Sequence, residues 1–514
     1  MFKNTKDNLK IKIAKFSYNL GWLILKPIIF LIFKPKFYNI ENINNLDPPL
    51  IFSSNHKSFL DSFIIGLGFP FRSKIFPIFW IAAEKYVKMP IIGFIVRLFG
   101  SISVKKGLGA ENSLKEALYY LKEKKINIGI FPEGKVVFDK DKIEVFKKGI
   151  GYLFYQTKAP IIPVAIRLDK KFEFSDLIKM KNKALIFLGR PIYEINANNY
   201  EEIANYLQKL TIDLFKIKDY YIEAGNLKIK LEKISLLNKI IHSIFLPFLN
   251  SKFFIFLIRK LSNDDKKLFK NHILDILIEA VDNLPKKNFF SFKLFGQFLS
   301  FIFEKLLFQT KALVNRSRIV KFLIKENLIS FNNQNEIKIL SLKEGFLRLI
   351  ISAISEINDQ NFIKKIKLYY IDNNEKYNYL SNQVKKEFNL DNLKIETINI
   401  DVWLFLDNPK NYIAYTGFDI IGLIGVLDRL PEKEVINRLN GCYDLLKNSG
   451  CLIASNIAPN NEMKFLENIS LSKLYYRNIV DWVYILKNTK FNKATKIIEE
   501  PLKFHNIIFI YKQT

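Results

Sequence analysis

Short apolar runs that end near Pro, Gly or Asn residues recur along the first two hundred residues. Between them lie longer stretches with helical spacing of apolar positions, for example Ala110–Lys125 and Tyr200–Lys216. The apolar runs are predicted as buried strands: Leu50–Ser54, Asn127–Phe131, Ile161–Ile166 and Ala184–Leu188. Because strands and helices alternate, we expect an α/β domain with a mostly parallel sheet over residues 37–220.

The pattern changes between residues 221 and 330, where helical spacing continues and strand signals are almost absent. We interpret this stretch as a helical linker region. From residue 331 to 514 strands and helices alternate again, which predicts a Rossmann-like, doubly wound parallel sheet. Its predicted strands are Ile337–Leu342, Ile366–Asp372, Leu393–Ile400, Phe418–Ile424, Cys451–Asn456 and Ile507–Tyr511, and its predicted helices are Phe346–Ile357, Asn374–Phe388 and Glu432–Lys447.

The first 36 residues contain an apolar run, Leu20–Phe33, that is interrupted by Lys26 and Pro27 and has lysines on both flanks. A helix that spans a bilayer needs roughly 20 apolar residues, so this run is too short. A short apolar helix with basic flanks is typical of a segment that lies in the membrane interface. We therefore predict a membrane-interface anchor, either a helix or a bent hairpin, with a buried core helix as the alternative.

Composition narrows the classes of partner. Of 514 residues, 49% are hydrophobic and 25% are charged, which excludes a disordered chain. The chain has 79 Lys and Arg residues against 50 Asp and Glu, a net charge of +29 that favours an anionic membrane face, a phosphorylated substrate or a nucleic acid. Because the charge is dispersed and no aromatic-basic motif is present, we expect no nucleic-acid partner. With Cys442 and Cys451 as the two cysteines, neither a disulfide framework nor a cysteine zinc site is expected, and we predict no metal site.

One histidine has reactive residues around it. His56 directly follows the predicted strand Leu50–Ser54, at the end where open α/β sheets place their ligands. Asp61 lies five residues later, so the two side chains meet only if His56 is on the loop and Asp61 is in the first helical turn. The carboxylate would then fix the imidazole tautomer, and the second ring nitrogen could accept a proton from a hydroxyl. The alternative is structural, because Ser58 and Asp61 match a capping box.

Four ordered blocks extend this pattern: Asn55-His56 with Asp61, Gly100–Lys106, Phe131–Gly134 and Ala159–Val164. In order and spacing they resemble the glycerolipid acyltransferase family, which includes the 1-acylglycerol-3-phosphate acyltransferases, over residues 35–215. The resemblance implies that His56 and Asp61 are catalytic. In that family such a pair activates an acceptor hydroxyl for attack on a fatty acyl thioester of coenzyme A or acyl carrier protein, and acyl transfer requires no cofactor.

The same resemblance implies a substrate-binding site, made by Asn55, Lys106, Glu133, Gly134 and Lys135. Lys106 stands where the family has an arginine, and Lys135-Val136 stands where it has Thr-Arg. A planar guanidinium that binds phosphate with two hydrogen bonds is therefore absent, and a lysine is a looser substitute. The acceptor stays open between lysophosphatidic acid, another lysolipid and a hydroxyl lipid without phosphate. Three further residues either contact a phosphate or thioester carrier or form a solvated basic face: Lys147, Lys148 and Gly149.

Three blocks lie in the second α/β pattern: Gly425–Leu430, Asn456–Asn460 and Leu474–Arg477. With the order of strands and Asp372 at a strand end, they resemble class I S-adenosylmethionine-dependent methyltransferases, in particular the methyltransferase-like proteins of 3-hydroxypalmitate methyl ester biosynthesis. The resemblance implies a site for S-adenosylmethionine that includes Gly345 and Asp372. The loop after the first strand departs from the pattern, because Lys343 and Glu344 stand where a Gly-x-Gly turn is usual.

We therefore predict a membrane-associated O-acyltransferase that is peripheral or monotopic on the cytoplasmic face of the cell membrane. Its expected partners are membrane lipids and acyl-CoA or acyl carrier protein. Two interpretations stay open for residues 331–514. They form either a methyltransferase, which would make the protein bifunctional and able to act on a non-phosphate lipid or fatty acid, or a non-catalytic docking module.

Overall fold

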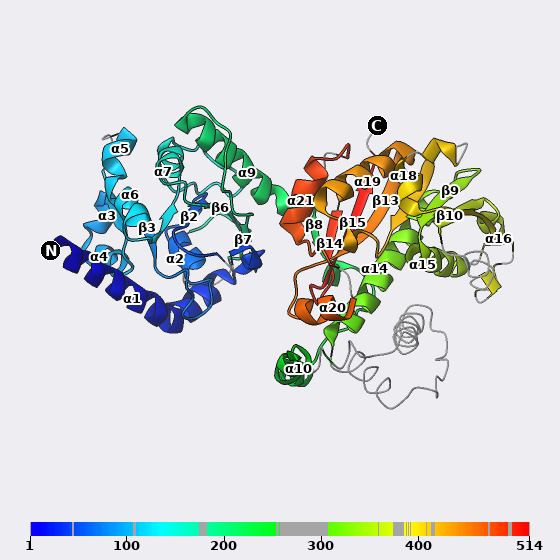
Figure 1. Cartoon of the computed structure of the whole chain (residues 1–514), viewed down its shortest axis with the longest axis horizontal. Helices are drawn as coiled ribbons and strands as arrows, with labels where there is room; N and C mark the ends of the chain where they lie inside the picture. The colour runs from blue at the N-terminus through cyan, green and yellow to red at the C-terminus, as the bar shows by residue number, and fades with distance from the viewer. Residues whose placement is uncertain are drawn as a thin grey trace. The chain divides into compact units, whose positions relative to one another are not determined.

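The structure is a computed structural model that describes most of the chain. The described residues are all except 1, 44–45, 106–108, 174–181, 253–255, 257–306, 358, 374–384, 387, 389, 391, 408, 413–416, 471–472, 492–495 and 513–514. The chain divides into two compact units, Met1–Lys218 and Asp219–Thr514. Figure 1 shows that each unit has its own sheet with helices packed around it.

The first unit is built on a seven-stranded sheet in the order β1-β7-β6-β2-β5-β3-β4. Its strands are β1 Lys36–Tyr38, β2 Ile51–Ser54, β3 Ile78–Ala83, β4 Ile102–Val104, β5 Asn127–Ile130, β6 Ile161–Leu168 and β7 Ala184–Leu188. Neighbouring strands are parallel except β6 and β7. All four residues of β2 are buried, as expected for a central strand covered on both faces.

Helices cover the sheet of the first unit: α1 Phe2–Phe33, α2 Asp61–Gly66, α3 Glu84–Val87, α4 Pro90–Leu98, α5 Gly109–Ser113, α6 Lys115–Lys122, α7 Gly149–Thr157 and α9 Tyr200–Tyr220. A short 3-10 helix, η1, spans Ile40–Ile43. The predicted helix Ala110–Lys125 is divided into α5 and α6. The α7 helix packs closely on α9, since a Cβ at Gly151 would lie 2.1 Å from the carbonyl oxygen of Tyr200.

The N-terminal segment forms one helix, α1, that continues through Pro27. One side of it is buried on the first unit at Ala14, Tyr18 and Phe33. Tyr18 donates a hydrogen bond to the carbonyl oxygen of Ile78 at 2.7 Å, and Trp22 donates to that of Phe69 at 2.8 Å. Among the described residues this is the one helix that is long and apolar enough to cross a membrane, and it lies along the protein unit (Figure 1).

The second unit contains an eight-stranded sheet in the order β11-β10-β9-β12-β13-β15-β14-β8. Its strands are β8 Tyr221–Glu223, β9 Ile337–Leu342, β10 Ile366–Asp372, β11 Lys394–Asn399, β12 Phe418–Leu423, β13 Leu446–Ile457, β14 Lys496–Glu499 and β15 His505–Tyr511. Strands β9 to β13 are parallel, and β15 is antiparallel to both β13 and β14. The chain order reverses direction between β9 and β12, which confirms the doubly wound fold predicted for this region.

The helices of the second unit are α10 Leu236–Leu249, α14 Phe308–Ser330, α15 Glu344–Ser355, α16 Gln360–Ile363, α18 Val402–Asp407, α19 Glu432–Leu445, α20 Met463–Ser470 and α21 Ile479–Lys487. The α14 helix contributes Ile319, Val320 and Ile324 to the same core as β9 and α15. Together with β8, it therefore makes described parts of residues 221–330 integral to this unit. The predicted helix Asn374–Phe388 lies mostly outside the described residues.

Candidate active site

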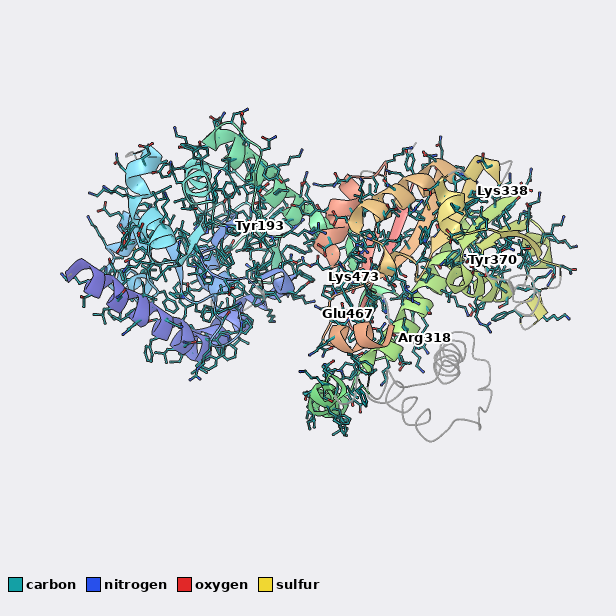
Figure 2. The ribbon with its side chains drawn as sticks, viewed as in Figure 1. Tyr193, Arg318, Lys338, Tyr370, Glu467 and Lys473 are labelled. Carbon is teal, nitrogen blue, oxygen red and sulfur yellow. The ribbon has the colours of Figure 1, made fainter. Side chains whose placement is uncertain are left out.

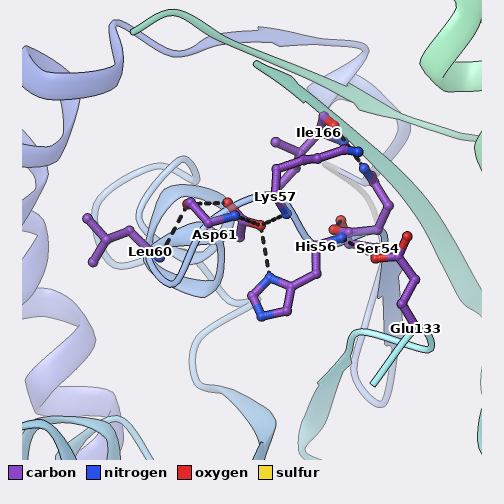
Figure 3. Close-up of polar contacts among 9 residues, drawn as sticks. Ser54, His56, Lys57, Leu60, Asp61, Glu133 and Ile166 are labelled. Atoms are coloured by element: carbon purple, nitrogen blue, oxygen red, sulfur yellow. Dashed lines mark hydrogen bonds and ion pairs between the residues drawn. The ribbon is translucent and has the colours of Figure 1, made fainter. Parts of the chain in front are cut away.

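The β2 strand ends at Ser54 and delivers His56 to the loop before α2 (Figure 3). Asp61 is the first residue of α2, the position that the sequence spacing requires if the pair is to meet. The Nδ1 atom of His56 lies 2.9 Å from Oδ2 of Asp61. Because an ionised carboxylate can only accept hydrogen bonds, Nδ1 carries the hydrogen and Nε2 presents its lone pair.

Four donors converge on the carboxylate of Asp61, which is fully buried. Besides His56 Nδ1, they are the backbone N–H groups of Lys57 at 2.5 Å and Ser58 at 2.9 Å, and the hydroxyl of Ser58 at 2.6 Å. Ser58 thus donates to Asp61 through its side chain, and the residue in the N-cap position of α2 is Leu60, without a side-chain cap. Half of the capping box considered as the alternative is present, since Asp61 accepts from the backbone N–H of Ser58, but the Ser58 hydroxyl donates to Asp61 instead of accepting from its N–H.

The imidazole of His56 is held flat against an aromatic stack. Its ring lies 3.9 Å from that of Phe131 with an interplanar angle of 9°, and Phe131 stacks on Trp80 at 4.8 Å. The side chain is 17% exposed. Within the described part of the chain Nε2 has no hydrogen-bond partner (Figure 3), so this nitrogen is available to a ligand.

Glu133 follows β5 and joins two separate loops. It is 2% exposed, and its carboxylate accepts hydrogen bonds from the backbone N–H of His56 at 2.7 Å and of Glu144 at 2.9 Å. Burial raises the pKa of Glu133, and the two backbone donors and Lys57 oppose that rise. Both oxygens accept from backbone N–H groups, so the geometry gives Glu133 a positioning role next to His56, and its predicted contact with the substrate stays a prediction.

Lys57 is a site residue that the sequence analysis did not identify. It is 1% exposed, and its Nζ donates to the carbonyl oxygens of Asp139, at 2.7 Å, and Lys142. The same ammonium lies 5.1 Å from the ring centre of Phe215. Burial lowers the pKa of Lys57, while the nearby carboxylates of Glu133, Asp139, Asp61 and Asp141 raise it. A buried cation thus fixes the segment 135–148 beside the histidine.

Asn55 also serves the protein itself. It is fully buried, its Nδ2 donates to the carbonyl oxygen of Ile166 at 2.9 Å, and its Oδ1 accepts from the N–H of Ile166 at 2.8 Å. These two bonds join the loop after β2 to β6. Asn55 exposes no polar atom here, and its predicted contact with the substrate stays a prediction.

Lys135, which is predicted to bind the acceptor, lies on the surface, as do Lys147 and Lys148. Gly134 has a φ of 67°, and a Cβ there would lie 2.7 Å from Nζ of Lys147, so the exposed Lys147 lies across this turn. Lys135 is exposed and forms an ion pair with Glu144 at 3.4 Å. Lys148 is exposed and Gly149 begins α7. Lys106 lies outside the described residues.

The loop after β9 departs from the glycine-rich turn that is usual at an S-adenosylmethionine site. Lys343 has a φ of 72° in the left-handed region that favours glycine. A Cβ at Gly345 would lie 2.9 Å from the carbonyl oxygen of Ile424, so the close approach that glycine permits is made here by the protein's own backbone. Asp372 is 8% exposed and accepts a hydrogen bond at 3.0 Å from the hydroxyl of Tyr370, which is labelled in Figure 2.

The three blocks of the second α/β pattern converge at the carboxyl ends of β12 and β13. Asp428 accepts hydrogen bonds from Nδ2 of Asn456 at 2.8 Å and from the N–H of Ile457 at 2.6 Å. Arg477 is 3% exposed and donates to Oδ1 of Asn456 at 2.5 Å and to the carbonyl oxygen of Leu427 at 3.1 Å. Burial raises the pKa of Asp428 against the opposing effect of nearby arginines. These side chains hold the blocks to one another.

Comparison with known proteins gives a family match within the first unit. Residues 34–167 match the family model described as Acyltransferase. The first unit contains an acyltransferase domain. The matched segment runs from the end of α1 into β6 and includes His56, Asp61 and Glu133.

Curated relatives of this acyltransferase domain are 1-acyl-sn-glycerol-3-phosphate acyltransferases. The chloroplastic enzyme of Brassica napus is 25% identical over 189 residues, which cover 36% of this chain and 52% of the relative. The Saccharomyces cerevisiae enzyme is 32% identical over 122 residues, which cover 23% of this chain and 38% of the relative. The chain therefore spans about half, or less, of the length of these curated relatives.

Solved structures with a similar fold include methyltransferases. Magnesium protoporphyrin IX methyltransferase from Synechocystis is 13% identical with a TM-score of 0.30, and the match covers 48% of this chain and all of that chain. A possible exported protein from Bordetella parapertussis is 11% identical with a TM-score of 0.33, and the match covers 55% of this chain and all of that chain. Likenesses of this strength assign no activity to the second unit.

Proposed function

We propose that the acyltransferase domain transfers a fatty acyl group from a thioester to a hydroxyl of a lysolipid such as 1-acylglycerol-3-phosphate. One observation carries the proposal: His56 has Nδ1 hydrogen-bonded to a buried carboxylate and Nε2 without a partner among the described residues. A base oriented in this way, within a domain of this family, is suited to activate a hydroxyl. The curated relatives carry the name of that reaction.

In the proposed reaction Nε2 of His56 accepts the proton of the acceptor hydroxyl while the hydroxyl oxygen attacks the thioester carbonyl carbon. Asp61 keeps the imidazole in the tautomer that can accept and stabilises the imidazolium that forms. When the carbon–sulfur bond breaks, the imidazolium returns the proton to the leaving thiolate. The ester and the free thiol are the products, and the protein is regenerated unchanged.

The surface lysines support a phosphorylated acceptor. Lys147 lies across the Gly134 turn, and Lys135 lies in the same segment. Two ammonium groups can attract a phosphate as point charges without the paired geometry of an arginine. Acyl-CoA and acyl carrier protein remain equivalent donors in this proposal, since both present the same thioester.

We further propose that the domain works on the cytoplasmic face of the cell membrane, with α1 in the interface. The helix contacts the unit from Asp7, which accepts hydrogen bonds from Tyr119 and Tyr120, to the buried Phe33. A helix attached along its length to a protein with many lysines is suited to lie in the interface plane. The interfacial position is therefore favoured over a transmembrane one.

For the second unit we propose a non-catalytic docking role. The supporting observation is the loop after β9, where Lys343 takes the left-handed conformation and Gly345 approaches Ile424. Methyl transfer, which would make the protein bifunctional, is the rival function. The surfaces available for docking include the exposed side chains of α10, such as Leu236 and Ile244.

The direct test supplies purified full-length protein with an acyl-CoA and a set of acceptors. We expect lysophosphatidic acid to be acylated faster than lysophosphatidylcholine and faster than a monoacylglycerol, because only the first exposes a phosphate monoester to the lysines. Product formation is measured by mass spectrometry of the extracted lipids. Preference for the monoacylglycerol would show that the acceptor lacks phosphate and would overturn this part of the proposal.

A further inference from the structure

The α4 helix exposes large apolar side chains on the surface of the first unit. Ile91 is 76% exposed, Phe94 is 58% exposed and Ile92 is 52% exposed. The helix is nevertheless held firmly, because a Cβ at Gly93 would lie 2.2 Å from the carbonyl oxygen of Val87, the last residue of α3. The α3–α4 hairpin, residues 84–98, is thus a packed element that presents apolar groups to the outside.

The end of α4 packs on α1, which also exposes a stripe of apolar residues. Phe99, directly after α4, packs edge-on against Tyr18 of α1 with ring centres 5.0 Å apart. A Cβ atom at Gly21 of α1 would lie 2.7 Å from Cζ of Phe99, so the ring packs directly on the glycine. The exposed apolar residues of α1 are Leu9, Ile13, Phe16, Leu20, Leu23, Ile24, Ile28 and Leu31. Figure 1 shows α4 beside the N-terminal half of α1, so two neighbouring helices each carry exposed large apolar side chains, a feature of interaction surfaces.

The basic residues around this apolar surface favour an anionic partner. The hairpin carries Lys85, Lys88 and Arg97, all exposed, against one acidic residue, Glu84, which is paired with Lys88 at 2.9 Å. Lys105, just beyond β4, has a side chain that is 63% exposed. Apolar side chains flanked by basic ones match the interface of a bilayer with anionic headgroups, where the rings and methyl groups enter the acyl region and the ammonium groups meet phosphates.

The hairpin also adjoins the loop of the candidate base. Tyr86 of α3 lies 6.0 Å, ring centre to ring centre, from Phe59, and Phe59 lies 5.6 Å from Phe138 in the segment fixed by Lys57. Phe59 is three residues after His56 and is 38% exposed. The ring contacts of Tyr86 and Phe59 therefore connect the α3–α4 hairpin to the loop that carries His56.

We propose that the α3–α4 hairpin is a second membrane-contacting element, which inserts Ile91, Ile92 and Phe94 into an anionic lipid surface and holds the His56 loop at the level of the headgroups. The lipid contact itself rests on the exposed apolar face and its charges. Its purpose, to give the histidine access to a lysolipid hydroxyl, rests on the proposed acyltransferase function.

The first test measures depth with a fluorescent label. Both native cysteines are buried, so a cysteine introduced at an exposed position can be labelled selectively in the full-length protein. We expect the probe on Ile91→Cys to be quenched by nitroxide-bearing lipids in vesicles of phosphatidylcholine and phosphatidylglycerol. The matched control is Tyr206→Cys on α9, which is 43% exposed and should not be quenched. Quenching at Leu23→Cys of α1 without quenching at Ile91→Cys would overturn the proposal while leaving α1 as a membrane contact.

The second test separates lipid contact from folding and from catalysis. Ile91→Asn with Phe94→Asn should weaken sedimentation with the same vesicles by roughly tenfold, while acylation of a short-chain, monomeric lysolipid is retained. The matched control replaces Tyr193, labelled in Figure 2, and Tyr206 with Asn, since both are exposed apolar residues outside α1 and α4. Unchanged vesicle binding would overturn the proposal, as would a fall in molecular mass by light scattering, which would assign the face to a second copy. Quenching at Ile91→Cys without any acyl transfer would overturn the proposed function and leave the lipid contact standing.

Discussion

The two units place polar side chains at the carboxyl ends of parallel strands, but they use them differently. After β2 and β5 in the first unit, Asn55, Lys57, Asp61 and Glu133 bond to the protein and leave Nε2 of His56 without a partner among the described residues. After β12 and β13 in the second unit, Asp428, Asn456 and Arg477 bond to one another. Buried polar groups that satisfy one another stabilise a fold, whereas one reactive atom left over among satisfied neighbours marks a site for chemistry.

Replacing Asp61 is the largest perturbation that keeps His56 in the chain. We expect Asp61→Asn to lower kcat for thioester-dependent acylation by a factor of at least about 10², because the imidazole loses the acceptor that fixes its tautomer. Thioester release is measured on purified protein together with its Tm. If the Tm falls but kcat does not, Asp61 is structural, and the contrast between the two units loses its basis.

Replacing Lys57 tests whether the buried cation positions the site. We expect Lys57→Met to lower kcat by roughly tenfold to a hundredfold with little change in the KM of the acceptor, since the segment 135–148 loses its attachment to the loop of His56. Lys57→Arg should restore part of kcat. The matched control is Lys140→Met in the same segment, whose side chain is 49% exposed and 3.9 Å from Asp141. Equal effects at both positions would rule out the positioning role.

The smallest expected effect is in the second unit. Full-length protein titrated with S-adenosylmethionine in a calorimeter should bind with a Kd of about 10⁻⁴ M or weaker, because the loop after β9 holds Lys343 where the ligand would need a glycine. Asp372→Ala should then change nothing measurable. Micromolar binding that Asp372→Ala abolishes would place a working cofactor site in the second unit and remove the contrast.

The sequence predicts the elements whose determinants are local. His56 and Asp61 are five residues apart, and the predicted bounds of β7, β9 and β10 agree with the structure. The strands β1 and β4 have three residues each and β3 runs directly into α3, so they give little periodic signal. The structure divides into two compact units, and the finer division into four domain ranges stays a prediction.

The site residues whose roles depend on distant partners could not be inferred in this way. Lys57 bonds to carbonyl groups 82 and 85 residues further along the chain, and by type a lysine is expected on the surface. Asn55 and Glu133 were recognisable by their blocks, yet their partners are 111 and 77 residues away in the chain. Only the folded sheet brings these groups together beside the histidine.

The most direct test of the account is the acylation rate of the full-length His56→Ala protein. We expect the rate with acyl-CoA and lysophosphatidic acid to fall by a factor of about 10² to 10⁴. The Tm should be nearly unchanged because, among the described residues, the ring bonds to Asp61 alone and stacks on Phe131. Retention of more than about a tenth of the wild-type rate would contradict the central claim that Nε2 of His56 is the base of the first unit.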